Sequence, residues 1–299
     1  MLSKFMLYNV SMDDKNKPKA LTSAVNLIIL ALVLVGIGYF FFQKPVNGLK
    51  VHFLSVGQGD AELIQTPSGQ SVLIDGGPDS SVVGEVEKYM PFYQKKIDAV
   101  ILSHPHADHV AGLVDIAKKY QIGHVYMTGI VHTAPEYLEF LKIVKDKNIQ
   151  ATDVKSGDKL DLGNDIRIDF LYPIKTLVGG KIDNLNNSSI VNRLVYGDSS
   201  VLFTGDLEKD SQDEMIAANP NIKSNILKVP HHGSKDATNP SLVEAVSPQF
   251  AVIEVGKNNK FGHPTATALQ SLVGIQVFRT DLDGDVTFNL TKTSVNREK

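Results

Sequence analysis

The chain has 299 residues, a formal net charge of −3 at pH 7 and no cysteine. The lack of cysteine excludes disulfides and thiolate metal ligands, so only histidine, aspartate and glutamate remain to bind a metal. Residues 1–43 carry four lysines against two aspartates, which leaves the rest of the chain acidic and without the basic balance of a non-specific nucleic-acid binder.

The N-terminal part of the sequence predicts a membrane anchor. Residues 1–19 are polar and lysine-bearing, whereas residues 20–43 have no charged side chain and are long enough to cross a ~30 Å hydrocarbon core as a helix. A cleaved signal peptide is the alternative, but no small-residue cleavage site follows Phe42. The lysines before the apolar run predict a single-pass protein of the cell membrane, with a cytoplasmic N-terminus and an extracellular main domain.

Residues 44–48 predict a linker, residues 49–291 one domain, and residues 292–299 a C-terminal tail. Alternating or continuous apolar runs predict strands at 49–56, 61–65, 71–74, 97–102, 123–127, 166–171, 189–196, 201–204, 226–229, 250–255, 276–279 and 286–290. Helical periodicity predicts helices at 81–89, 110–120, 135–147, 208–217, 240–246 and 265–273. Hairpin strands followed by alternating helices and strands predict an α/β sandwich with mixed sheets.

The most informative stretch is the loop between the predicted strand at 97–102 and the helix at 110–120. It places His104, His106, Asp108 and His109 within six residues. Imidazole and carboxylate groups bind the same divalent metals, and a tight loop brings such groups to one point. The pattern therefore predicts a metal site, and the alternative is a polar surface loop.

Three other predicted strands also end on metal-binding side chains. Asp206 follows the strand at 201–204, and His231 and His232 follow the strand at 226–229. A carboxylate such as Asp206 can bridge two metals that lie ~3.5–4 Å apart. Asp75, after the strand at 71–74, is placed to hydrogen-bond a ligating histidine, and its alternative role is that of a turn or helix-capping aspartate.

Several motifs carry a family resemblance. His104-x-His106-x-Asp108-His109, Thr204-Gly205-Asp206 and Pro230-His231-His232-Gly233-Ser234 resemble the metal motifs of the metallo-β-lactamase superfamily. Other motifs, in the same order, resemble the hydrolase domain of ComEC-type competence proteins: residues 53–61, 73–77, 186–189, 261–264 and 279–284. The resemblance covers residues 49 to 290.

This resemblance implies a four-layer αββα sandwich that holds two divalent ions, Zn²⁺ or Mn²⁺. By the family pattern, His104 and His106 would hold one ion, Asp206 would bridge, and the second ion would be held by Asp108, His109 and His231. The histidine that the family usually supplies before the bridging aspartate has no counterpart here, and Asn187 and Ser188 occupy its place. We therefore expect the first ion to be bound more weakly.

The implied activity is hydrolysis of a phosphodiester, with single-stranded DNA as one candidate substrate, by a metal-bridged hydroxide held at Asp108 and Asp206. His232 and His263 are candidates for contacting the substrate or protonating the leaving group. The alternative roles are a hydrogen-bonded support for His232 and a loop position packed against Pro264 for His263.

Two other functions fit the sequence. An anchored acidic domain would also suit a cell-surface phosphoester of the teichoic-acid type, because one predicted span cannot form the many-helix channel of ComEC. A non-catalytic metal-binding module of a membrane assembly is the second alternative. Metal content combined with a phosphodiesterase assay separates the module from an enzyme.

Overall fold

The computed structural model describes the backbone of residues 19–42 and 48–298, and the side chains of residues 25–36 and 48–298. The chain divides into two compact units, Met1–Pro45 and Val46–Lys299. In the first unit, helix α1 spans Lys19–Phe42. Among the described residues, no helix is both long and apolar enough to cross a membrane. The ends of the predicted anchor, residues 20–24 and 37–43, lie outside the described side chains, as do the tail before residue 19 and most of the predicted linker.

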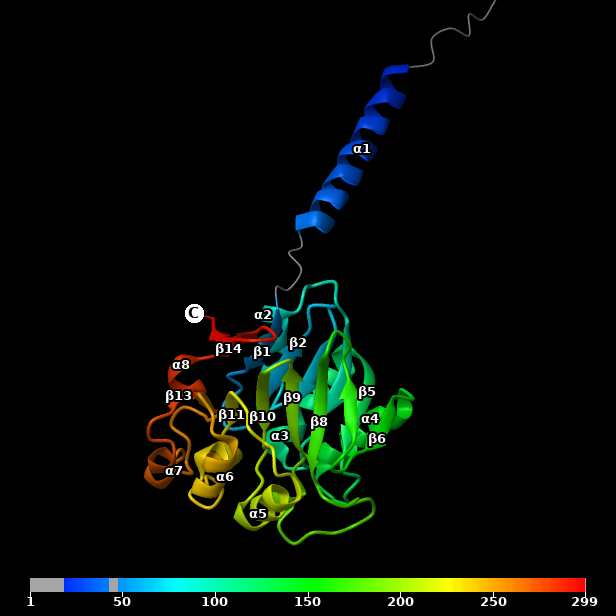
Figure 1. Ribbon diagram of the computed structural model, residues 1–299. Coiled ribbons are helices and arrows are strands. Elements are labelled where there is room, and N and C mark those ends of the chain that lie inside the picture. The colour runs from blue at the N-terminus through cyan, green and yellow to red at the C-terminus, as the bar shows by residue number, and fades with distance from the viewer. Residues whose placement is uncertain (1–18, 43–47, 299) are drawn as a thin grey trace, which may run out of the picture. The chain divides into compact units, whose positions relative to one another are not determined.

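The second unit is built on two β-sheets (Figure 1). One has eight strands in the order β15-β14-β1-β2-β3-β4-β5-β6, and the other has seven in the order β13-β12-β11-β10-β9-β8-β7. The strands of the first are β1 (Leu49–Phe53), β2 (Glu62–Gln65), β3 (Ser71–Ile74), β4 (Lys96–Ile101), β5 (Gln121–Met127), β6 (Gln150–Asp153), β14 (Val286–Leu290) and β15 (Val295–Arg297). Those of the second are β7 (Lys159–Asp161), β8 (Ile166–Tyr172), β9 (Val191–Tyr196), β10 (Ser199–Phe203), β11 (Ile226–Lys228), β12 (Phe250–Ile253) and β13 (Gln276–Arg279).

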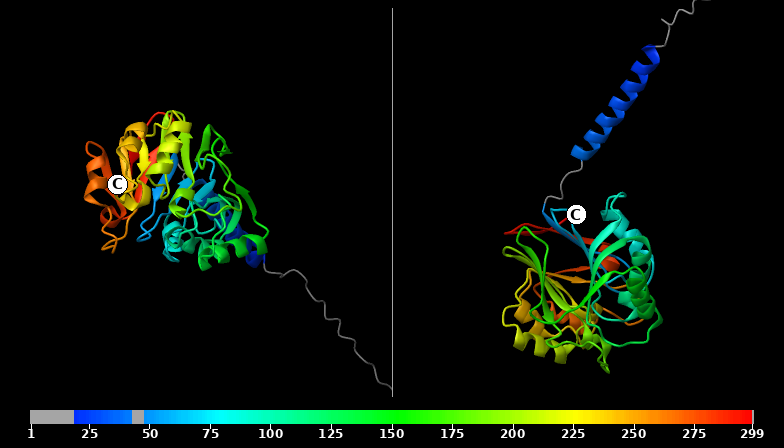
Figure 2. Two further views of the ribbon diagram at one scale, coloured as in Figure 1. Left: turned by 90° about the horizontal axis from the view of Figure 1, so that it is seen from below. Right: turned by 90° about the vertical axis from the view of Figure 1, so that its right-hand side faces the viewer.

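Helices cover the outer face of each sheet, so the unit has four layers (Figure 2). Helices α2 (Ser81–Tyr89), α3 (Ala107–Lys119) and α4 (Pro135–Asp146) pack on the eight-stranded sheet. The outer face of the seven-stranded sheet is covered by α5 (Lys209–Ala218), α6 (Pro240–Val246) and α7 (Ala266–Ser271). The inner faces of both sheets share one apolar core, which includes Phe53, Phe203 and Phe288. This arrangement is the predicted αββα sandwich.

Three strands were not predicted from the sequence. All six side chains of β6 and β7 other than Leu160 are exposed, and β15 buries only Val295. Each of the three strands lies at an edge of its sheet, where one row of backbone groups is paired and little apolar surface is covered. The expected C-terminal tail, 292–299, therefore contains a paired strand, β15, which the apolar pattern could not indicate.

The topology gathers the predicted site residues at one edge of the sandwich. Strands β3 and β4 are parallel neighbours, as are β10, β11 and β12, and the candidate residues follow their carboxyl ends. The start of α3 lies very close to two neighbouring loops. A Cβ at Gly59 would lie 2.2 Å from the carbonyl oxygen of Asp108, and one at Gly112 would lie 1.9 Å from that of Gly76. Glycine at these two positions allows the loops to approach the site.

Candidate metal centre

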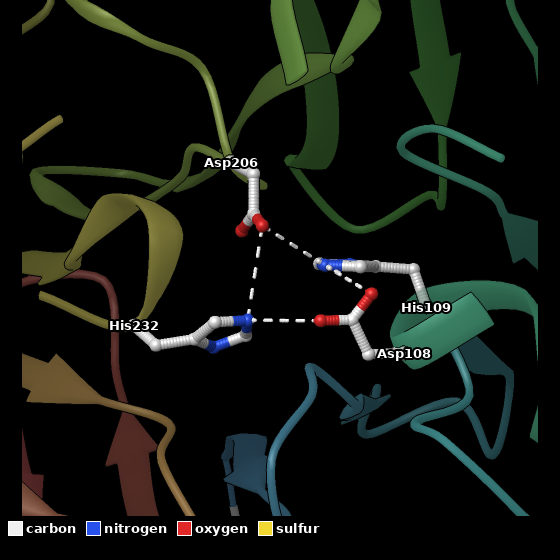
Figure 3. A group of neighbouring side chains, drawn as sticks. All are labelled: Asp108, His109, Asp206 and His232. Atoms are coloured by element: carbon white, nitrogen blue, oxygen red, sulfur yellow. Dashed lines mark ion pairs between the residues drawn. The ribbon is translucent and has the colours of Figure 1, made fainter. Parts of the chain in front are cut away.

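Four side chains meet at this edge of the sandwich: Asp108, His109, Asp206 and His232 (Figure 3). Their ligating atoms all lie within 4.8 Å of one another. Asp206 Oδ2 is 3.3 Å from His109 Nε2 and 3.7 Å from His232 Nε2. Asp108 Oδ2 is 3.5 Å from His232 Nε2. Two imidazole nitrogens and two carboxylates form a ligand set that suits a divalent metal such as zinc.

Both imidazoles are oriented by hydrogen bonds at Nδ1, the ring nitrogen that does not face the other ligands. His109 Nδ1 donates to Asp75 Oδ2 at 2.8 Å, and His232 Nδ1 donates to the backbone carbonyl of Glu254 at 2.8 Å. With Nδ1 protonated, the neutral ring carries its lone pair on Nε2. Both Nε2 atoms, and Asp206 Oδ1 beside them, are buried and have no hydrogen-bond partner. Such unpaired atoms are costly unless something binds them, so the residues present fit a metal ion.

The pKa shifts of His109 and His232 also favour a bound cation. Burial alone would lower the pKa of His109, but the carboxylates of Asp206 and Asp75 raise it well above its usual value. Burial likewise opposes the charge on His232, and Asp206 and Asp60 raise its pKa to about 10. The buried carboxylates thus stabilise positive charge at the two imidazoles. A divalent cation among the four ligands would supply that charge directly.

Left-handed backbone conformations shape the site. Asp75, His231 and His232 have φ angles of 52°, 50° and 54°. Each such conformation costs a non-glycine residue about 1–3 kcal/mol, and persists where the surrounding structure fixes it, often at functional sites. The two consecutive left-handed residues after β11 turn the adjacent imidazoles in different directions.

The structure places His231 and His232 differently relative to the four-residue group. The structure brings His232, not His231, into the four-residue group. His231 Nε2 lies 3.8 Å from Asp206 Oδ2, but Asn186 Nδ2 donates to His231 Nδ1 at 3.4 Å. In the tautomer that accepts this hydrogen bond at Nδ1, Nε2 carries the proton and has no lone pair for a metal. The same Asn186 Nδ2 donates to Glu208 Oε1 at 2.9 Å, which supports this orientation of the amide.

His104 and His106 lie beside the four-residue group. Among the described residues, neither belongs to a group of three metal-binding side chains. Ser103 Oγ donates to Asp75 Oδ2 at 2.5 Å and so accepts from His104 Nδ1, 3.0 Å away. His104 Nε2 then accepts a 2.9 Å hydrogen bond from His106 Nδ1. A metal ion at His104 would have to displace this bond.

The remaining predicted residues surround the centre. Asn187 Oδ1 accepts from the backbone N–H of Glu208 at 3.2 Å, and Ser188 Oγ donates to the carbonyl of Leu185 at 2.6 Å, so both support loops. The ring of His263 lies 5.7 Å from that of His231 and 6.5 Å from that of His232. Burial and these two imidazoles lower the pKa of His263. A neutral His263 suits a hydrogen-bonding role better than that of a proton donor at neutral pH.

A buried charged cluster behind the ligands had not been predicted. Lys228 is fully buried and forms an ion pair with Asp60, and its Nζ also donates to the carbonyl of Gly205 at 3.1 Å. Glu62 and Glu254 complete the cluster with Asp60. Asp60 in turn lies 3.3 Å from His232 Nδ1. This cluster therefore adjoins the candidate ligands through Asp60 and sets part of their charge environment.

The cluster predicts an unusual pH dependence of stability. Burial first, and then the charge of Asp60, raise the pKa of Glu254 to about 8. At Glu254 the folded protein therefore keeps a proton that the unfolded chain has lost, and the contribution of this group to the free energy of unfolding falls as pH rises from about 5 to about 8. The expected slope is about 1.4 kcal/mol per pH unit. The Glu254→Gln variant should lose this contribution, because its amide stays neutral and can still accept from the N–H of Ala61. The neighbouring Glu62, whose pKa burial also raises, still titrates in the variant.

Thermal unfolding of the metal-free protein across this pH window tests the prediction. Glu244→Gln, at an exposed position on α6, is the matched control and should follow the wild type. A Glu254→Gln curve parallel to the wild-type curve would contradict the protonated state of Glu254.

Comparisons with known proteins show the family of this chain. Residues 54–256 match the family described as the metallo-beta-lactamase superfamily. ComE operon protein 3 of Bacillus subtilis is 32% identical over 258 residues, which cover 80% of this chain and 33% of that protein. Competence protein ComA of Neisseria gonorrhoeae is 29% identical over 259 residues, 85% of this chain and 34% of that protein. The chain thus spans about a third of the length of these curated relatives.

Solved structures show the same fold. The metallo-beta-lactamase fold protein YhfI from Bacillus subtilis matches with a TM-score of 0.53 and 16% identity, over 84% of this chain and 100% of that one. Igni18, a metallo hydrolase from Ignicoccus hospitalis, matches with a TM-score of 0.51 and 13% identity, over 81% of this chain and 100% of that one. Sequence match, two-sheet fold and ligand cluster agree: the chain belongs to the metallo-beta-lactamase superfamily, as a metal-dependent hydrolase related to the competence proteins.

Proposed function

We propose that this protein is a metal-dependent phosphodiesterase that cleaves nucleic-acid strands. The observation that carries the proposal is the convergence of two buried, unpaired Nε2 atoms, of His109 and His232, on the carboxylates of Asp108 and Asp206. Relatives named for competence and for recombination support a nucleic acid as the substrate. The nuclease activity, like the activity of the full-length relatives, is a proposal for this chain.

Each residue of the centre has a distinct part in this proposal. A bound Zn²⁺ or Mn²⁺ would lower the pKa of a coordinated water toward ~7 and offset charge on the phosphodiester. Asp206 faces both imidazoles through Oδ2, so it fixes the distance between them. Asp108 is the most open ligand, with 35% of its side chain exposed, and marks the side from which a substrate enters. Asp75 holds His109 in the ligating orientation.

We propose a second ion at His104 and His106, with Asp206 shared between the two ions. This site would fill after the first, because the hydrogen bond between the two histidines must break. We also propose that residues 20–43 anchor the protein in the cell membrane, with the catalytic unit outside. The support for the anchor is the uncharged apolar run of the sequence.

A reconstitution experiment with the full chain tests the activity. The purified protein is stripped of metal, loaded with Zn²⁺ or Mn²⁺, and given single-stranded DNA, bis-p-nitrophenyl phosphate or the monoester p-nitrophenyl phosphate. We expect metal-dependent hydrolysis of both diesters, little hydrolysis of the monoester, and loss of activity with EDTA. Metal binding without turnover on either diester would instead favour a non-catalytic module.

A further inference from the structure

The loop between β12 and α7, residues 254–265, presents an aromatic ring to solvent next to the metal centre. Phe261 is 57% exposed. We propose that Phe261 is a stacking platform for a base of the bound nucleic acid, close to the bond that is cleaved. This inference rests on the proposed phosphodiesterase function and narrows its substrate class to strands that carry bases.

Phe261 is connected to the metal centre by a series of rings. The Phe261 ring stacks on His263, with centroids 5.9 Å apart and an interplanar angle of 27°. His263 in turn lies 6.5 Å from His232 at an angle of 30°. Each ring is tilted by 30° or less from the next, and the series runs from the ligand His232 out to the exposed Phe261. A base stacked on Phe261 would continue this series and keep its strand near the ligands.

The loop that carries the ring is held in place before any substrate arrives. Asn259 Oδ1 accepts from the backbone N–H groups of Phe261, at 3.2 Å, and His263, at 3.0 Å. Asn259 Nδ2 donates to the carbonyl of His263 at 2.7 Å. Gly256 donates its N–H to Gln58 Oε1 at 3.1 Å, which ties the loop to the turn after β1. A preorganised ring loses less conformational entropy when a ligand binds.

The charge of the loop also fits a nucleic-acid strand. Lys257 and Lys260 are exposed, and residues 256–265 contain no acidic side chain, although the chain as a whole is acidic. Lys260 Nζ lies over the Phe261 ring, 5.3 Å from its centroid, and this exposed, flexible side chain would move aside when a base stacks on that face. Lysines beside aromatic rings are the usual means of binding single strands, because the cations contact phosphates while bases stack. A polyol phosphate would use the lysines but would gain little from an exposed flat ring.

Two matched substrates separate the contribution of the ring from that of the charges. Oligothymidylate and an abasic oligonucleotide of the same length carry the same phosphates, and only the first has bases. We expect Phe261→Ala and Phe261→Leu to lower kcat/KM on oligothymidylate about 5- to 100-fold, the range given by stacking on one aromatic side chain. Both variants should leave cleavage of the abasic strand nearly unchanged. Phe261→Trp should retain wild-type preference, and Leu138→Ala, an exposed apolar site on α4, is the control.

Binding of the two labelled strands by fluorescence anisotropy gives a second readout that needs no turnover. An equal loss on both strands in the Phe261→Ala variant, or full activity in Phe261→Leu, would overturn the stacking role. So would unchanged oligothymidylate binding in both variants. If the wild type cleaves neither strand nor the model diester, the proposed activity fails. Binding that prefers oligothymidylate and depends on Phe261 would then still support the platform.

Discussion

Replacing Asp206 with alanine is expected to reduce phosphodiester hydrolysis by about a thousandfold or more. Asp206 Oδ2 is the atom that faces both His109 Nε2 and His232 Nε2, so its loss removes one ligand and the spacing of two others. Metal ions contribute several kcal/mol to transition-state stabilisation, and each ~1.4 kcal/mol is a factor of ten in rate. The measurements are kcat/KM on single-stranded DNA and metal content per chain by elemental analysis.

The fold should survive this change, because Lys228 keeps its ion pair with Asp60 when Asp206 is removed. Thermal unfolding and circular dichroism check that the variant is folded. Asp210→Ala serves as the matched control, since Asp210 is exposed in the first turn of α5 and contacts none of the proposed ligands. Wild-type activity in a folded Asp206→Ala protein would contradict the assignment of the centre.

The sequence predicted the fold where apolar patterns were strong. The bounds of α2, β3, β13 and β14 agree with the predicted ranges to the residue. Helix α2 buries Val82 and Val86, one helical turn apart, and β3 and β14 are short runs of mostly buried residues. Both patterns are visible without tertiary information. The edge strands β6, β7 and β15 bury little, so their pairing depends on a neighbouring strand rather than on their own residues.

At the site, too, the sequence showed local patterns but not pairing between distant segments. The ligand loop, Asp206 and Asp75 could be found because each follows an apolar strand, and parallel strands bring their carboxyl ends to one edge. Asp60 and Lys228 are 168 residues apart, and nothing local indicates that they pair. Lys228 lies in the short strand β11 and resembles a solvent-facing residue, yet that strand lies inside a sheet covered on both faces. Long-range pairing of buried charges was therefore missed.

The sequence also could not show which of His231 and His232 faces the other ligands. Adjacent residues in a strand point to opposite sides, but these two follow the end of β11 and both have left-handed backbone angles. Their directions are set by partners from distant segments, Asn186 for His231 and the carbonyl of Glu254 for His232. A family motif that contains two histidines could not indicate which one faces the ligands.

The two histidines predict opposite results on substitution. His232→Ala should weaken metal binding and lower kcat/KM by about a hundredfold or more, because it removes a buried Nε2 from the centre. His231→Ala should cost less than about tenfold, since His231 is 27% exposed and Asn186 occupies its Nδ1. Metal affinity by chelator competition, with kcat/KM on the same preparations, compares the pair.

Each variant is the control for the other, because they remove the same side chain from adjacent positions on one turn. Thermal unfolding separates loss of metal from loss of fold in His232→Ala, which also loses the hydrogen bond to Glu254. If His231→Ala loses the metal while His232→Ala keeps it, the ligand is the one that the family motif implied. The orientation of Asn186 would then have to reverse, so that its amide oxygen rather than its nitrogen faces the ring of His231.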